Sequence, residues 1–220
     1  MLMKSRKLLI VGLAVWLVSW SSPCASQRAQ ADGRNVRIEF NGMLHSRVVA
    51  KFEGRNLAIG DLGPSESLTV AGKEIRDFTL HDVKRESARD VMCVGQRVTL
   101  TGAAPSLKKI VAVTTCDEFP QMAVFQVHYT NTGDSSLSVD GWTNQRYSIS
   151  AGQGSGEPAF WSYQSGSYEK RPDWVLPLKA GFDQENYLGM NDTDYGGGTP
   201  VVDVWRRDVG ITVGHLELSP

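Results

Sequence analysis

The chain has 220 residues, of which 41% are hydrophobic and 21% are charged. This balance is typical of about one or two globular domains and excludes a disordered or collagen-like chain. Lysine and arginine number 23 against 24 aspartate and glutamate, so the net charge is −1 and no basic surface for nucleic acid is indicated. The 22 glycines predict many turns.

An export signal is predicted at the amino terminus. Three basic residues within 4–7 precede an apolar run over 8–20, which is shorter than the ~20 residues of a membrane-spanning helix. We expect residues 1–31 to be a signal peptide, cleaved after Ser26 or Ala31, and the protein to be secreted or periplasmic with no membrane partner afterwards. An uncleaved anchor is the alternative. Removal of this segment changes the net charge from −1 to −5.

Two cysteines, Cys93 and Cys116, follow the signal peptide. An oxidising compartment permits a disulfide between them, and the alternative is a pair of separately buried thiols. The sequence contains neither a CxxC pair nor a cluster of Cys and His at metal-binding spacing, so we expect no zinc site and no cofactor.

Short strands are predicted along most of the remaining chain. Residues 36–40 and 43–52 flank Asn41-Gly42, which predicts a hairpin. Residues 122–130 have apolar side chains on both faces, which predicts a central strand, whereas 54–67 is typical of a loop and 84–89 of a short helical turn. Further strands are expected near 75–83, 97–101, 107–115, 137–149, 201–205 and 209–218.

The fold class predicted from these elements is all-β. No stretch of about ten or more residues with a 3.6-residue period follows the signal peptide. Many short strands separated by turns are typical of a sandwich. We therefore expect one large antiparallel β-sandwich over residues 32–220.

Residues 150–200 are predicted to be a long loop region in which aromatic side chains are interspersed with Asp, Asn, Gln and Glu. Loops this long are uncommon in compact domains unless they are functional or disordered, and so many aromatics argue against disorder. Rings stack on the flat faces of sugars while polar planar groups bind hydroxyls, so carbohydrate binding is one interpretation. The other is that the aromatics pack beneath their own loops as a satellite core.

Two strings in this region carry a resemblance to a known family. They are WSYQSGSYEKRPDW over 161–174 and QENYLGMNDTDYGGGTPVVDVW over 184–205. Both resemble the amino-terminal domain of α-galactosidase-like (melibiase) enzymes of glycoside hydrolase family 36. The resemblance covers residues 120–220 well and 36–119 only as a compatible pattern of strands. It implies a β-supersandwich of the galactose-mutarotase-like type, followed in the family by a (β/α)8 barrel that supplies a catalytic pair of Asp residues.

The barrel itself is not expected in this chain, because it needs ~250 residues of alternating strands and helices. The resemblance therefore implies the amino-terminal, non-catalytic part of an exported α-galactosidase-like enzyme, truncated before its barrel and without a catalytic residue. Its partners would be an α-galactoside and a catalytic barrel domain. The alternative is a free-standing secreted carbohydrate-binding β-sandwich.

The resemblance also implies substrate contacts in the 184–205 string. Asp194 would accept hydrogen bonds from sugar hydroxyls beside Tyr195, and Trp161 or Trp174 would offer a stacking face. A triple glycine follows at 196–198 and lets the backbone approach a ligand closely. The alternative for Asp194 is support of its own turn.

Overall fold

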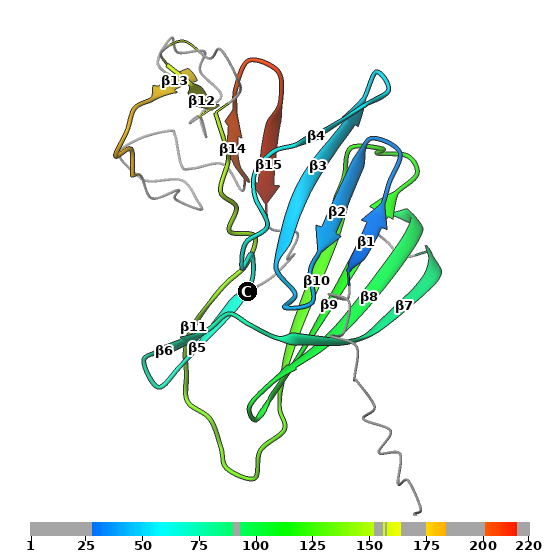
Figure 1. Cartoon of the computed structure of the whole chain (residues 1–220), viewed down its shortest axis with the longest axis vertical. Helices are drawn as coiled ribbons and strands as arrows, with labels where there is room; N and C mark the ends of the chain where they lie inside the picture. The colour runs from blue at the N-terminus through cyan, green and yellow to red at the C-terminus, as the bar shows by residue number, and fades with distance from the viewer. Residues whose placement is uncertain are drawn as a thin grey trace, which may run out of the picture.

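The computed structural model describes residues 28–89, 93–151, 156, 158–163, 175–183 and 201–214. Within this part of the chain the fold is all-β, and every strand pair is antiparallel. The strands form four sheets, with the orders β1-β2-β3-β4, β10-β9-β8-β7, β11-β5-β6 and β13-β12-β14-β15 (Figure 1). For these residues the prediction of an antiparallel all-β fold is confirmed, whereas the single large sandwich over 32–220 stays a prediction.

The first sheet is a meander of four short strands. It comprises β1 (Ala29–Asp32), β2 (Val36–Phe40), β3 (Ser46–Phe52) and β4 (Arg55–Ala58). The predicted hairpin joins β2 to β3, where Asn41 Oδ1 accepts hydrogen bonds from the backbone N–H of Met43 and of His45. The loop expected over 54–67 is wrong in its first part, because β4 pairs with β3 there.

The second sheet contains the longest strands of the described chain. It comprises β7 (Thr79–Arg89), β8 (Val94–Ala104), β9 (Leu107–Cys116) and β10 (Ala123–Asn131). Residues 84–89 belong to β7 and pair with β8, so the helical turn expected there is wrong. The strand expected at 122–130 exists as β10, but it lies at the edge of the sheet and not at its centre.

One hydrophobic core lies between these two sheets. Figure 1 shows the blue β1–β4 sheet in front of the green β7–β10 sheet. Side chains from both sheets and from the segments that connect them are buried together, and burial of each large one contributes about 1.5 to 3 kcal/mol. The largest apolar members are Phe40, Phe78, Ile38, Leu44, Leu100, Val111 and Val113.

Two smaller sheets flank this core. One comprises β5 (Ser67–Val70), β6 (Lys73–Ile75) and β11 (Val139–Thr143), and it contributes Leu68 to the core. The other comprises β12 (Phe160–Tyr163), β13 (Val175–Leu178), β14 (Val201–Trp205) and β15 (Gly210–Gly214). The predicted pair of strands near the carboxyl end is therefore present as β14 and β15, while β12 and β13 lie in the region expected to be loop.

Strand β1 overlaps the segment predicted to be a signal peptide. Ala29 and Ala31 are buried in the core, and β1 pairs along its length with β2. Cleavage after Ser26 leaves this strand whole, whereas cleavage after Ala31 removes most of it. The packing of β1 therefore favours the first of the two positions. The described residues include no helix of the length and apolar character needed to cross a membrane.

Ion pairs cover the outer face of the β1–β4 sheet. Asp32 Oδ1 accepts hydrogen bonds from Lys51 Nζ at 2.8 Å and from Arg37 Nε at 3.1 Å. Partial burial alone would raise the pKa of Asp32, but the hydrogen bonds and charges of Lys51 and Arg37 outweigh it, so the pKa lies below its ordinary value. A carboxyl whose pKa is lower in the folded state stabilises the fold at neutral pH.

This stabilisation is expected to disappear as the pH falls through the folded-state pKa of Asp32. Replacing Asp32 by Asn is expected to cost less than about 1 kcal/mol of unfolding free energy at about pH 7, because the pair is partly exposed and screened, and less still at about pH 3. Urea unfolding of both proteins at the two pH values measures the difference. An equal cost at both would contradict the assignment.

Candidate functional site

The residues predicted to contact a sugar lie mostly outside the described chain. Trp161 lies in β12 and is partly exposed. Trp174, Asp194 and Tyr195 fall outside the described residues, so their roles stay predictions. Of the four predicted contacts, Trp161 is the one that lies within the described residues.

Aromatic side chains gather on one face of the β12–β15 sheet. Trp161 is the Cα partner of Trp205 in β14 and of Pro177 in β13. Residues that are partners across an antiparallel pair share a face, and so do residues two positions apart on one strand. Trp161, Tyr163, Asp203 and Trp205 therefore occupy the same side, and we call these four residues the aromatic face.

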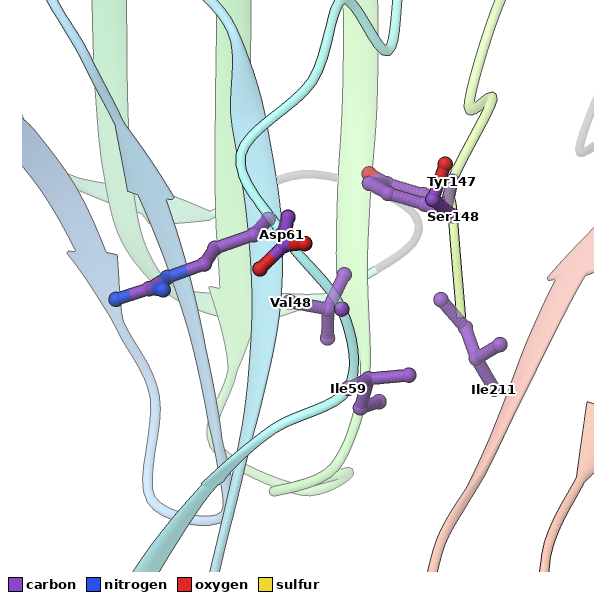
Figure 2. Close-up of a pocket in the computed structure, with 8 residues that line it drawn as sticks. Val48, Ile59, Asp61, Tyr147, Ser148 and Ile211 are labelled. Carbon is purple, nitrogen blue, oxygen red and sulfur yellow. The ribbon is translucent and has the colours of Figure 1, made fainter. Parts of the chain in front are cut away.

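The opposite side of the β14–β15 hairpin is aliphatic. Ile211 is the Cα partner of Val204, which places both on the side away from Trp205. Ile211 lines a pocket together with Val48 and Ile59 of the β1–β4 region. Figure 2 shows Val48, Ile59 and Asp61 on one side of this pocket and Tyr147, Ser148 and Ile211 on the other. The aliphatic side thus turns toward the first sheet, and the aromatic face turns away from it.

That pocket is too small to hold a sugar. Its volume is about 10 Å³, which is room for about one water molecule. Sites for small molecules usually enclose about 300 to 1,000 Å³. This pocket is therefore not a candidate site for a sugar.

Hydrogen bonds at Asp203 hold the aromatic face together. Trp161 and Trp205 are the one Cα pair that joins β12 to β14 in the described chain. Asp203 Oδ1 accepts a hydrogen bond of 2.8 Å from the backbone N–H of Tyr163, and the buried Ser162 hydroxyl donates to the Asp203 carbonyl oxygen at 2.7 Å. These contacts place a carboxylate beside two tryptophans and a tyrosine whose side chain is 38% exposed.

A glycine makes room for Trp205. Gly210 is its Cα partner across the β14–β15 hairpin. A Cβ atom on Gly210 would lie 2.7 Å from Trp205 Cβ, closer than two such carbons can approach. Any other residue here would push Trp205 out of its position on the aromatic face.

Arg206 anchors the same hairpin to the rest of the molecule. Its side chain is buried, and its guanidinium donates hydrogen bonds to the Ser150 carbonyl oxygen and to Asp208 Oδ1. The hydrogen bond from Arg206 lowers the pKa of Asp208 below its ordinary value. Arg206 thereby holds the β14–β15 hairpin, and with it the aromatic face, against the segment over 144–150.

The aromatic face presents flat apolar rings and one acceptor but no set of metal ligands among the described residues. Two indoles and a phenol provide flat apolar surfaces, and Asp203 provides a hydrogen-bond acceptor beside them. Among the described residues no three His, Cys, Asp or Glu side chains lie close enough together to hold a metal ion. Cys93 and Cys116 are joined in a disulfide with their Cα atoms 5.5 Å apart, at the far end of β9.

A second group of polar side chains is buried in the core. Lys109 of β9 and Glu66 are both fully buried, and Lys109 Nζ donates to Glu66 Oε2 at 3.1 Å and to the Glu66 carbonyl oxygen at 3.0 Å. Gln145 Nε2 donates to Glu66 Oε1 at 3.2 Å, and the Tyr147 hydroxyl donates to Gln145 Oε1 at 2.5 Å. We call Glu66, Lys109, Gln145 and Tyr147 the buried polar cluster.

Burial and charge shift the pKa values of the groups in and around this cluster. Burial lowers the pKa of Lys109, although the charge of Glu66 opposes the shift. Burial, together with the charge of Glu66, raises the pKa values of Tyr129 and Tyr147 above their ordinary range. Lys109 Nζ also lies 5.3 Å from the centre of the Phe78 ring. The Lys109 ammonium thus contacts the Glu66 carboxylate and lies over the Phe78 ring.

Sequence reasoning missed the buried polar cluster. One signal was present. Lys109 is on the same face of β9 as Leu107, Val111 and Val113, and all three of these apolar residues are buried. A lysine within a series that faces inward requires a partner. Its partner lies in a segment that is typical of a loop, so the pairing itself was not visible in the sequence.

No protein-family model matches this chain, and no curated protein matches it.

Proposed function

We propose that the chain is a non-catalytic, carbohydrate-binding part of an exported α-galactosidase-like glycoside hydrolase, and that it contacts α-galactosides through the aromatic face. The single observation that carries this proposal is the presence of Trp161, Trp205 and Asp203 on one side of one sheet. All three belong to the strings that resemble the amino-terminal domain of family 36 enzymes. A β-supersandwich that precedes a separate catalytic barrel is part of the same proposal.

The chemistry of the aromatic face suits a galactoside. An indole covers the apolar C–H face of a pyranose ring, and a carboxylate accepts hydrogen bonds from the hydroxyls at its edge. The strands hold Trp161 and Trp205 in place before the ligand arrives, so little conformational entropy is lost on binding. Asp194, Tyr195 and Trp174 would add contacts from the neighbouring segments.

A free-standing carbohydrate-binding β-sandwich is the second candidate. It is favoured by the position of the aromatic face on paired strands, because such a platform needs no barrel to assemble it. A free-standing binder needs useful affinity by itself, whereas a component of an enzyme needs only weak contacts that add to those of its barrel.

Calorimetric titration of the purified chain with melibiose tests galactoside binding by the aromatic face, which both candidates require. Replacing Trp161 by Ala is expected to weaken binding about two- to twelvefold, because a stacked ring contributes about 0.5 to 1.5 kcal/mol. Trp142 is the matched control, since it is 69% exposed on β11 and lies outside the aromatic face. Trp142→Ala is expected to bind as the wild type does. Equal binding by wild type and Trp161→Ala would contradict the role of the aromatic face.

The same titration separates the two candidates. Micromolar affinity of the chain alone favours the free-standing binder, and millimolar affinity favours the enzyme component. Neither candidate hydrolyses a nitrophenyl α-galactoside. Turnover by the purified chain, with no other protein present, would overturn both.

A further inference from the structure

The buried polar cluster contains the parts needed to form an amide bond. Lys109 supplies an amine and Gln145 a carboxamide. Glu66 supplies a carboxylate, whose Oε2 accepts a hydrogen bond from Lys109 Nζ and whose Oε1 accepts one from Gln145 Nε2. Tyr147 supplies a hydroxyl that already donates to the carboxamide oxygen of Gln145. Sugar binding uses none of these four groups, so their arrangement is a separate observation.

We propose that Lys109 and Gln145 become joined by an intramolecular amide bond between Nζ and Cδ, with release of ammonia. The cross-link ties β9 to the segment over 144–150. It is independent of whether the aromatic face binds a sugar.

The reaction balances without any other reactant. The Lys109 ammonium gives a proton to Glu66, and the neutral amine attacks Cδ of Gln145. Glu66 passes this proton to the amide nitrogen, the C–N bond breaks, and ammonia leaves. Nζ loses its second proton to Glu66 as the new amide forms. The products are a secondary amide, ammonia and a protonated Glu66, and no group is oxidised or reduced.

The surroundings favour each step. Burial lowers the pKa of Lys109, so the neutral amine is more accessible than on a solvated lysine. The Tyr147 hydroxyl lies 2.5 Å from Gln145 Oε1, where negative charge develops during the attack. Glu66 contacts both the amine and the carboxamide, so the two groups belong to one cluster of the same folded chain and need no second molecule to meet.

The products also suit the core better than the reactants. A fully buried ion pair carries a large desolvation cost, which its mutual attraction only partly offsets. The amide and the protonated Glu66 are both neutral. Bond formation therefore removes two charges from an interior in which both side chains are 0% exposed.

The backbone holds Gln145 in place for this reaction. Its φ angle is 59°, a left-handed conformation that residues with a Cβ rarely adopt. The next residue, Arg146, donates its backbone N–H to the Ser65 carbonyl oxygen at 2.9 Å, directly beside Glu66.

Intact-mass measurement of the denatured and reduced protein tests the proposal. The expected mass is lower than that of the sequence by one ammonia, and tryptic digestion is expected to give one branched peptide that contains both Lys109 and Gln145. Cleavage after Ser26 exposes Gln27 at the amino terminus, where cyclisation would also release ammonia. The branched peptide distinguishes the two losses.

Matched variants complete the test. Lys109→Arg keeps the charge and Glu66→Gln keeps the shape, and each is expected to abolish the branched peptide. Lys108→Arg, the neighbour on the other face of β9, is expected to retain it. Any of three results would overturn the proposal. They are a wild-type protein that has lost no ammonia, an ammonia loss confined to Gln27, and a Lys109–Glu66 link formed by loss of water.

Discussion

Replacing Lys109 by Met is expected to lower the free energy of unfolding by about 3 to 5 kcal/mol. The reason is the position of Glu66, which is fully buried and would keep its carboxylate without the ammonium that contacts it at 3.1 Å. The variant also lacks the amine needed for the proposed amide bond. Urea unfolding followed by tryptophan fluorescence measures the loss.

Two further variants show that the loss arises from the unpaired charge. Lys109→Met combined with Glu66→Leu removes both charges and is expected to recover much of the stability, short of what the amide bond contributes. Arg55→Met removes an exposed ion pair with Glu53 and is expected to cost less than about 1 kcal/mol. Wild-type stability of Lys109→Met would contradict a stabilising role of Lys109 beside Glu66, either as an ion pair or through the proposed amide bond.

Replacing Cys93 and Cys116 together by Ser is expected to cost about 3 kcal/mol. The disulfide spans 23 residues of sequence, and a cross-link of that length restricts the unfolded chain substantially. It ties the start of β8 to the end of β9. Thermal unfolding of wild type and variant measures the difference.

Reduction provides the control for this prediction. Addition of a thiol reductant is expected to lower the midpoint of the wild type toward that of the double Cys→Ser variant and to leave the variant unchanged. A wild-type protein that unfolds identically with and without reductant would show that the disulfide does not form.

Strands with strong local patterns were predictable from the sequence. Val36, Ile38 and Phe40 alternate with polar residues, and all three are buried in β2. Residues 84–89 are polar except for Ala88 and carry no such alternation, so a helical turn was expected. They form a strand because β8 supplies partners, as in the pairing of Glu86 with Arg97. Tertiary pairing overrides local preference at such positions.

The position of a strand within its sheet was harder to predict from the sequence. β10 is rich in apolar residues, which led to the expectation of a central strand. Phe125, Val127 and Tyr129 pack against the core, while Gln126 and His128 between them are exposed, so only one face of β10 is covered. Which strands become neighbours depends on long-range packing that a single sequence does not encode locally.

The candidate site was predictable in part. The resemblance directed attention to Trp161 and to the string that contains Asp203 and Trp205. The sharing of one face by these residues depends on the register between β12 and β14, which follows from pairing and not from spacing. The contact between Glu66 and Lys109 joins residues 43 positions apart and could not be predicted from the sequence.

Titration of the full chain with methyl α-galactoside, followed by the indole N–H signals in nitrogen-15 NMR spectra, tests sugar binding by the aromatic face most directly. The signals of Trp161 and Trp205 are expected to shift together with added ligand, and that of Trp142 to remain in place. Saturating ligand that leaves both Trp161 and Trp205 unmoved would contradict sugar binding at this surface.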